Sequence, residues 1–137
     1  SAIDAKFSIP FCVATALRTG RVTLASFADD ALSDPATLAL AARVRAVHDA
    51  RRARPASAGG GEVVELAMAD GSRHARAVEH LRGSVEDPLT DAELHAKFVE
   101  CALASASRPT RERVERLAAS VASLEDVPDV GSLLAGP

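Results

Sequence analysis

The alternation of side chains between positions 64 and 68 constrains the fold of this chain more than any other feature. The segment VELAM at residues 64–68 places apolar side chains at every second position, which is the pattern of a half-buried β-strand. Asp70 and Gly71 follow and favour a tight turn into a second strand over residues 73–80. The sequence therefore predicts a β-hairpin in the middle of the chain.

Helical patterns precede the hairpin. Residues 8–19 carry apolar side chains at helical spacing, with Ser8 as the N-cap and Gly20 as the C-terminal residue. Ser26 is expected to cap a brief helix that holds Phe27 and Leu32. Asp34 followed by Pro35 predicts the start of a third helix, because a capping residue precedes proline at the first helical position.

Two more helices are predicted after a loop at residues 83–88. Thr90 and Glu93 form a capping-box pattern at the start of the first. Its expected buried stripe consists of Leu94, Phe98, Cys101 and Ala102. The last helix follows Pro109, and its expected apolar face consists of Val114, Leu117, Ala118, Val121 and Leu124.

A polar strand is predicted over residues 44–49, before a low-complexity loop at residues 51–61. Three strands with helices at both ends of the chain favour an α+β class: a two-layer sandwich of helices on a small antiparallel sheet, plus C-terminal helices. Because three strands form a weak sheet, a fourth strand is expected upstream of Ser1.

Composition excludes several classes of function. The 137 residues carry a net charge of −3, and no basic run is interleaved with aromatic residues, so nucleic acid is not an expected partner. No apolar stretch approaches the roughly 20 residues that span a bilayer, and no leader-like segment opens the chain, so we expect a cytoplasmic protein with no membrane partner. Cys12 and Cys101 are expected to be reduced, buried thiols.

Most candidate chemical groups are better interpreted as solvated surface. The four histidines are scattered, with no spacing that suggests a metal site. The adjacent acids at positions 29–30 and 86–87 are expected to face water. The arginines at positions 51, 52 and 54 and the glycines at 59–61 are expected to belong to a linker loop.

The segment AKFSIPF at residues 5–11 is the strongest candidate. It places the cation of Lys6 and the hydroxyl of Ser8 at the N-terminus of a helix, where free N–H groups favour an anion. A capping serine beside an exposed lysine is also common without any function. On the residues alone, both interpretations remain open.

The same segment carries a family resemblance. AKFSIPFCVATALRTG resembles the "EAKFSxPYxxAxAxxxG" signature that opens the C-terminal domain of the MmgE/PrpD family. Four further segments resemble motifs of the family in the same order: LAMADG at 66–71, GSVEDPLT at 83–90, ELHAKF at 93–98, and LEDV at 124–127 with the leucines at 133 and 134.

The resemblance implies part of a two-domain, cofactor-free enzyme. Members include 2-methylcitrate dehydratases, an activity of propionate metabolism, as well as cis-aconitate decarboxylases and iminodisuccinate epimerases. Residues 1–105 resemble the α/β lid domain, and residues 108–137 resemble helices that return to an N-terminal helical domain. That domain is expected to carry most proton-transfer groups, so the fragment alone is expected to be inactive. Family members are usually dimers, and a homodimer is expected.

The expected substrate is a small polycarboxylate such as 2-methylcitrate, dehydrated by proton removal next to a carboxylate. By resemblance, Lys6, Ser8 and Phe11 bind the substrate or form the wall of its site. Phe11 stands where many members carry a tyrosine, while Lys97 is interpreted as structural and paired with a carboxylate or helix end. No catalytic residue and no metal ligand is assigned within the chain. The alternative is a non-catalytic module for small-anion binding or dimerisation.

Overall fold

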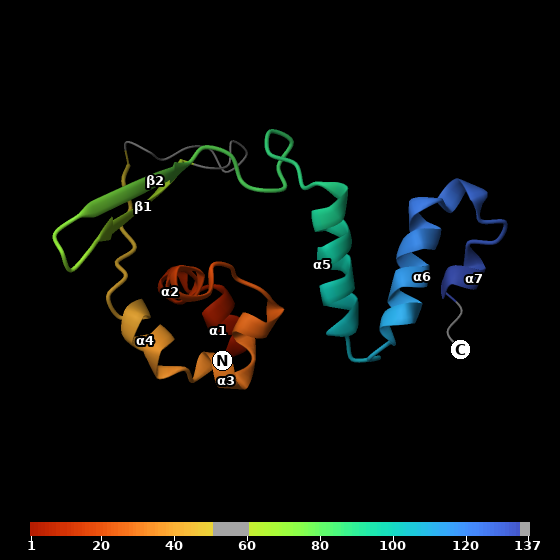
Figure 1. Cartoon of the computed structure of the whole chain (residues 1–137), viewed down its shortest axis with the longest axis horizontal. Coiled ribbons are helices and arrows are strands. Elements are labelled where there is room, and N and C mark those ends of the chain that lie inside the picture. Colours follow the sequence, from red (N-terminus) through yellow and green to blue (C-terminus); the bar gives the residue numbers. More distant parts are fainter. Residues whose placement is uncertain (51–60, 135–137) are drawn as a thin grey trace. The chain divides into compact units, whose positions relative to one another are not determined.

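A computed structural model describes residues 1–50 and 61–134 (Figure 1). The chain divides into two compact units, one formed by Ser1–Val47 with His95–Pro137 and the other by His48–Leu94. Helices and an antiparallel strand pair are both present. The predicted α+β class is confirmed.

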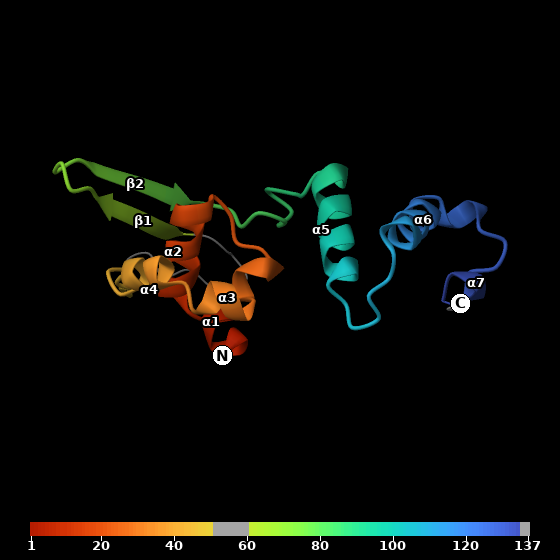
Figure 2. The ribbon, with the colours of Figure 1, turned by 60° about the horizontal axis from the view of Figure 1, so that its bottom comes forward.

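Short helices fill the N-terminal part of the first unit (Figures 1 and 2). They are α1 (Ala2–Lys6), α2 (Ile9–Thr19), the 3-10 helix η1 (Leu24–Phe27), α3 (Asp29–Leu32) and α4 (Pro35–Ala41). The predicted ends of α2 are confirmed: the Ser8 hydroxyl accepts a hydrogen bond from Phe11 N, and Gly20 ends the helix at φ 79°. Glycine suits this left-handed position because it has no Cβ to clash.

The core of this part is small and consists mainly of short side chains. Helix α2 packs against α4, and Ala14 on α2 is completely buried. The Phe11 ring is 6% exposed and lies 6.1 Å from the Phe27 ring, measured between ring centroids. This packing agrees with the composition, since alanine makes up about a fifth of the chain and aromatic residues only 3%.

Asp34 connects α2 to the start of α4. Its carboxylate caps α4 by accepting a hydrogen bond from Thr37 N at 2.9 Å, and it also accepts from the Thr37 hydroxyl and from Arg18 of α2. The hydroxyl and backbone bonds from Thr37, followed by the Arg18 charge, lower the pKa of Asp34 against the opposing effect of burial.

Two local predictions before the hairpin were wrong. Residues 44–49 form no strand, and Val47 is 82% exposed. The segment is polar, and in the described residues the sheet pairs only β1 with β2, so residues 44–49 have no partner strand there. Ser26 does not cap a helix from outside but lies within η1, where its hydroxyl accepts from Thr23 N at 3.1 Å.

The second unit contains the predicted hairpin, formed by β1 (Glu62–Ala67) and β2 (Arg73–Val78). The strands pair antiparallel with Leu66 opposite His74. At the turn, Gly71 has φ 86°, and Asp70 Oδ1 accepts from Ser72 N at 2.9 Å. The hairpin is confirmed, whereas most of the predicted loop at 51–61 lies outside the described residues.

The loop after the hairpin joins the start of α5 (Asp91–Leu103) through Arg82. The predicted capping box is confirmed, with Glu93 Oε2 accepting from Thr90 N at 2.8 Å and Thr90 Oγ1 accepting from Glu93 N at 3.2 Å. Arg82 binds the carboxylates of Asp87 and Glu93. The Thr90 bonds and then Arg82 lower the pKa of Glu93.

The remaining helices are α6 (Arg111–Ala122), the 3-10 helix η3 (Leu124–Asp126) and α7 (Gly131–Leu134). The predicted stripe on α5 is confirmed only in part: Phe98 and Ala102 are half-buried, but Leu94 is 57% exposed and Cys101 is exposed, while the buried residue is Val99. On α6, Val114 of the predicted apolar face is buried, whereas Val121 of the same face is 56% exposed. Among the described residues, no helix has the length and apolar character needed to cross a bilayer.

The lowered pKa of Asp34 predicts an acid-sensitive connection between α2 and α4. A carboxylate with a lowered pKa in the folded state stabilises the protein above its ordinary pKa, and this stability is lost as pH falls through the folded-state value. Asp34→Asn keeps a good N-cap residue but removes the charge. Thermal unfolding from pH 7 to pH 3 should show Asp34→Asn melting below the unmodified protein at neutral pH, with the gap closing in acid.

Asp30→Asn is the matched control, because the Asp30 side chain is exposed and makes no hydrogen bond among residues 1–50 and 61–134. Its melting temperature should follow that of the unmodified protein at every pH. A gap for Asp34→Asn that stays constant down to pH 3 would contradict the assigned role of the charge.

Candidate functional site

The turn between α1 and α2 brings Lys6, Ser8 and Phe11 into one short region. Lys6 is the last residue of α1, Ser8 is the N-cap of α2, and Phe11 lies in the first turn of α2. The Cys12 thiol, also on α2, donates a hydrogen bond to the carbonyl oxygen of Ala5 at 3.6 Å. The helix ends therefore meet in a hydrogen-bonded corner, which we call the Lys6 corner (Lys6, Ser8, Phe11 and Phe27).

Phe27 forms the platform of the Lys6 corner. Lys6 Nζ lies 5.7 Å from the centroid of the Phe27 ring, within the range of a cation–π interaction. The same ring contacts Phe11, with an interplanar angle of 37°. Phe11 is buried and lacks a hydroxyl, so it supports the corner by packing and donates no hydrogen bond to a ligand.

The electrostatics of the corner favour an anion. The Lys6 side chain is exposed, and its ammonium forms no ion pair with a carboxylate in the described part of the chain. The Ser8 hydroxyl accepts from Phe11 N at 3.3 Å and keeps its own proton to donate. A cation with no ion-pair partner among the described residues, two positions before a hydroxyl at the positive end of an 11-residue helix, can bind a carboxylate group.

Large apolar side chains lie exposed along the same stretch of chain. Ile3 is 68% exposed, Phe7 is 86% exposed and Ile9 is 60% exposed. Phe7 and Ile9 flank Ser8 in the sequence, and Ile3 lies one helical turn before Lys6 or Phe7. Three exposed apolar side chains so close together mark a surface suited to contact with another protein surface.

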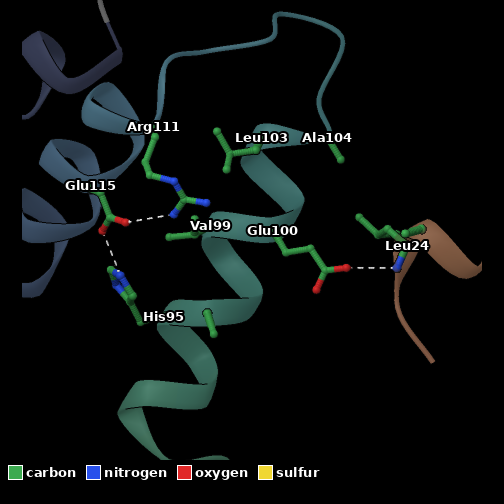
Figure 3. Close-up of a pocket in the computed structure, with 10 residues that line it drawn as sticks. Leu24, His95, Val99, Glu100, Leu103, Ala104, Arg111 and Glu115 are labelled. Carbon is green, nitrogen blue, oxygen red and sulfur yellow. Dashed lines mark hydrogen bonds and ion pairs between the residues drawn. The ribbon is translucent and has the colours of Figure 1, made fainter. Parts of the chain in front are cut away.

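A second feature of the first unit is an open groove of about 790 Å³ lined by residues of η1, α5 and α6 (Figure 3). Glu115 Oε2 lies 2.9 Å from His95 Nε2, and Glu115 Oε1 lies 3.5 Å from Arg111 Nη1. Glu100 Oε1 accepts from Leu24 N at 3.0 Å. Both carboxylates are therefore already engaged, and Val99 and Leu103 are among the apolar side chains that line the groove.

Sequence reasoning interpreted His95 as an isolated surface residue and missed its pairing with Glu115. The Arg111–Glu115 pair has the i, i+4 spacing of a helical ion pair and could have been predicted. The His95–Glu115 contact joins two helices and leaves no signal in the local sequence. Lys97, predicted to pair, is exposed and has no carboxylate partner among the residues the structure describes.

The other candidate groups stay apart. Over residues 1–50 and 61–134, no group of three or more His, Cys, Asp or Glu side chains could hold a metal ion. Cys12 and Cys101 are free thiols, but Cys12 is only half-buried and Cys101 is exposed, so the prediction that both are buried was wrong. Glu86 has a lowered pKa, caused first by a hydrogen bond from its own backbone and then by Ser84. The predicted arginine cluster at 51, 52 and 54 lies outside the described residues.

The fold and the Lys6 corner together define an α+β domain that presents a cation, a hydroxyl and a helix N-terminus on an exposed apolar surface. The family model of the MmgE/PrpD C-terminal domain matches residues 1–124. The chain therefore belongs to the MmgE/PrpD family, as the motifs in the sequence predicted. A search of curated proteins found no significant match.

The geometry of the Lys6 corner predicts a measurable coupling between Lys6 and Phe27. A double-mutant cycle with Lys6→Met and Phe27→Leu separates the cation–π contact from the packing of each side chain. Chemical denaturation should give a coupling of about 0.5–1 kcal/mol. The cycle of Lys97→Met with Phe27→Leu should give none, and a value near zero in both cycles would place the ammonium away from the ring.

Proposed function

We propose that this chain is the C-terminal domain of an MmgE/PrpD lyase that acts on a small polycarboxylate such as 2-methylcitrate. The proposal rests on two groups: the Lys6 ammonium, which forms no ion pair among the described residues, and the Ser8 hydroxyl two positions further along, at the N-terminus of α2. These groups lie in the segment that resembles the opening signature of the family domain, and the match covers residues 1–124.

The reaction is a dehydration next to a carboxylate. A base removes a proton from the carbon beside a carboxylate, the C–O bond to a neighbouring hydroxyl breaks, and a carbon–carbon double bond forms as water leaves. Negative charge develops on the carboxylate during proton removal, and fixed donors that bind this charge lower the barrier. Lys6 and Ser8 supply such donors.

The base and the acid come from the N-terminal helical domain of the family, which is the proposed partner of this chain. The exposed side chains of Ile3, Phe7 and Ile9 support a docking surface for that domain around the Lys6 corner. Closure of one domain on the other would exclude water and increase the strength of the Lys6–carboxylate attraction. The domain by itself is then inactive, and the complete enzyme works as a cytoplasmic homodimer.

The direct test uses the protein that joins this domain to its helical partner domain. Incubation with 2-methylcitrate should produce the absorbance of an unsaturated acid, whereas this domain alone should produce none. A parallel incubation with cis-aconitate distinguishes dehydration from decarboxylation. No turnover of either acid by the two-domain protein would remove both substrates and favour a non-catalytic role in anion binding or dimerisation.

Lys6→Ala should lower kcat/KM by about tenfold or more, because a charged hydrogen bond to the substrate is lost. Lys97→Ala is the matched control, since Lys97 is an exposed lysine that the proposal places outside the site. Its kinetic constants should equal those of the unmodified enzyme. Equal kcat/KM values for the two variants would move the substrate-binding role away from Lys6.

A further inference from the structure

We propose that a second cavity, at the C-terminal end of α2, is a binding site for a small carboxylate. It measures about 330 Å³ and lies within the first unit, lined by residues of α2, η1, α3 and α4 and the segment between α2 and η1. Its volume is at the lower end of the range for small-molecule sites, about 300–1,000 Å³. We call it the Thr15 cavity, after the residue that first indicates a ligand.

Thr15 presents a buried hydroxyl without a partner. The residue lines the cavity and is 5% exposed, and its Oγ1 makes no hydrogen bond within the described residues. Leaving a buried hydroxyl unpaired costs about 1–3 kcal/mol, so native proteins nearly always satisfy such groups. Rotation about the Cα–Cβ bond of Thr15 would bring its hydroxyl to a hydrogen-bonding molecule in the cavity. The hydrogen bond to that molecule would remove the free-energy cost of the unpaired hydroxyl.

The other polar groups of the Thr15 cavity favour an anionic ligand. Arg21 lines the cavity, and its guanidinium makes no ion pair in the part of the chain that the structure describes. The Ser26 hydroxyl accepts from Thr23 N at 3.1 Å and retains a proton to donate. Arg21 and Ser26 line the cavity with available donors, and the Thr15 hydroxyl adds a third once it has rotated toward the ligand.

The one carboxylate in the lining does not reverse this preference. Asp34 is already bound by Arg18 and by both the backbone N–H and the hydroxyl of Thr37. The charged residues of the lining are Arg18, Arg21 and Asp34, which together give it a net charge of +1. A small carboxylate matches this charge and accepts hydrogen bonds from both arginine and hydroxyl donors.

This site is distinct from the Lys6 corner, because Lys6 and Ser8 lie before the first turn of α2 while Arg18 and Arg21 lie at and beyond its last turn. The inference therefore stands apart from the proposed lyase activity. Its experiment is carried out in a Lys6→Ala background, which removes carboxylate binding at the other site. A loss of acetate binding at the Thr15 cavity can then be distinguished from a failure of the proposed lyase activity.

The probe is sodium acetate, and its binding to the two-domain protein is measured by saturation-transfer NMR. Sodium chloride keeps the ionic strength constant as the acetate concentration changes. We expect a saturable acetate signal that persists in Lys6→Ala. Arg21→Gln should weaken binding about tenfold through loss of a charged hydrogen bond. Thr15→Val should weaken it severalfold, while Thr15→Ser, which keeps the hydroxyl, should retain it.

Arg45→Gln is the matched control, because Arg45 is an exposed arginine that does not line the cavity. Thr15→Val should fold normally, with an unchanged or higher melting temperature in chloride, since it removes an unpaired buried hydroxyl without changing the shape of the side chain. A cavity filled by water alone would give no saturable signal and overturn the proposal. A signal that Thr15→Val and Arg21→Gln leave unchanged would also overturn it.

Discussion

The contact between the Phe11 and Phe27 rings is the interaction on which the candidate site depends. The chain has four phenylalanines and no tryptophan or tyrosine, so two of its four aromatic side chains meet at this one place. The contact joins α2 to η1, segments separated by the Gly20 turn. It thereby holds the Phe27 ring under the Lys6 ammonium. An anion site built on a flexible lysine gains precision from such a platform, because less side-chain freedom is lost on binding.

Helix α2 links the two proposed binding sites. Its N-terminus carries the Lys6 corner, and its last turn carries the Thr15 cavity, so both rely on the packing of this helix against α4. Ala14, with no exposed surface, permits that packing, and Asp34 connects α4 back to Arg18. A chain with few large side chains is thus stabilised at this point by capping and charge as well as by apolar burial. The acid sensitivity of Asp34 follows from the same arrangement.

Features encoded by neighbouring residues could be predicted from the sequence, and contacts between distant segments could not. The Ser8 cap, the Asp70–Gly71 turn and the Thr90 capping box each depend on residues within one turn of each other, and each is confirmed. The failed strand at residues 44–49 needed a partner strand that local pattern cannot supply.

The same distinction applies to the sites. Lys6, Ser8 and Phe11 were predicted together because the family signature places them in one segment, and the structure brings Phe27 to them from η1. The His95–Glu115 pair and the unpaired Thr15 hydroxyl depend on how separate helices pack. The buried face of α5 was predicted only in part for the same reason, because the burial of Val99 depends on tertiary packing that the apolar periodicity of the helix does not show.

The presence of only two lysines in this chain allows the central claim to be measured directly. The two-domain protein would be treated with an amine-reactive reagent, with and without a saturating tricarboxylate, and the labelling of Lys6 and Lys97 would be quantified by peptide mass spectrometry. If Lys6 binds the substrate carboxylate, the tricarboxylate should protect Lys6 and leave Lys97 fully reactive. Equal labelling of Lys6 in the presence and absence of the tricarboxylate would contradict the account.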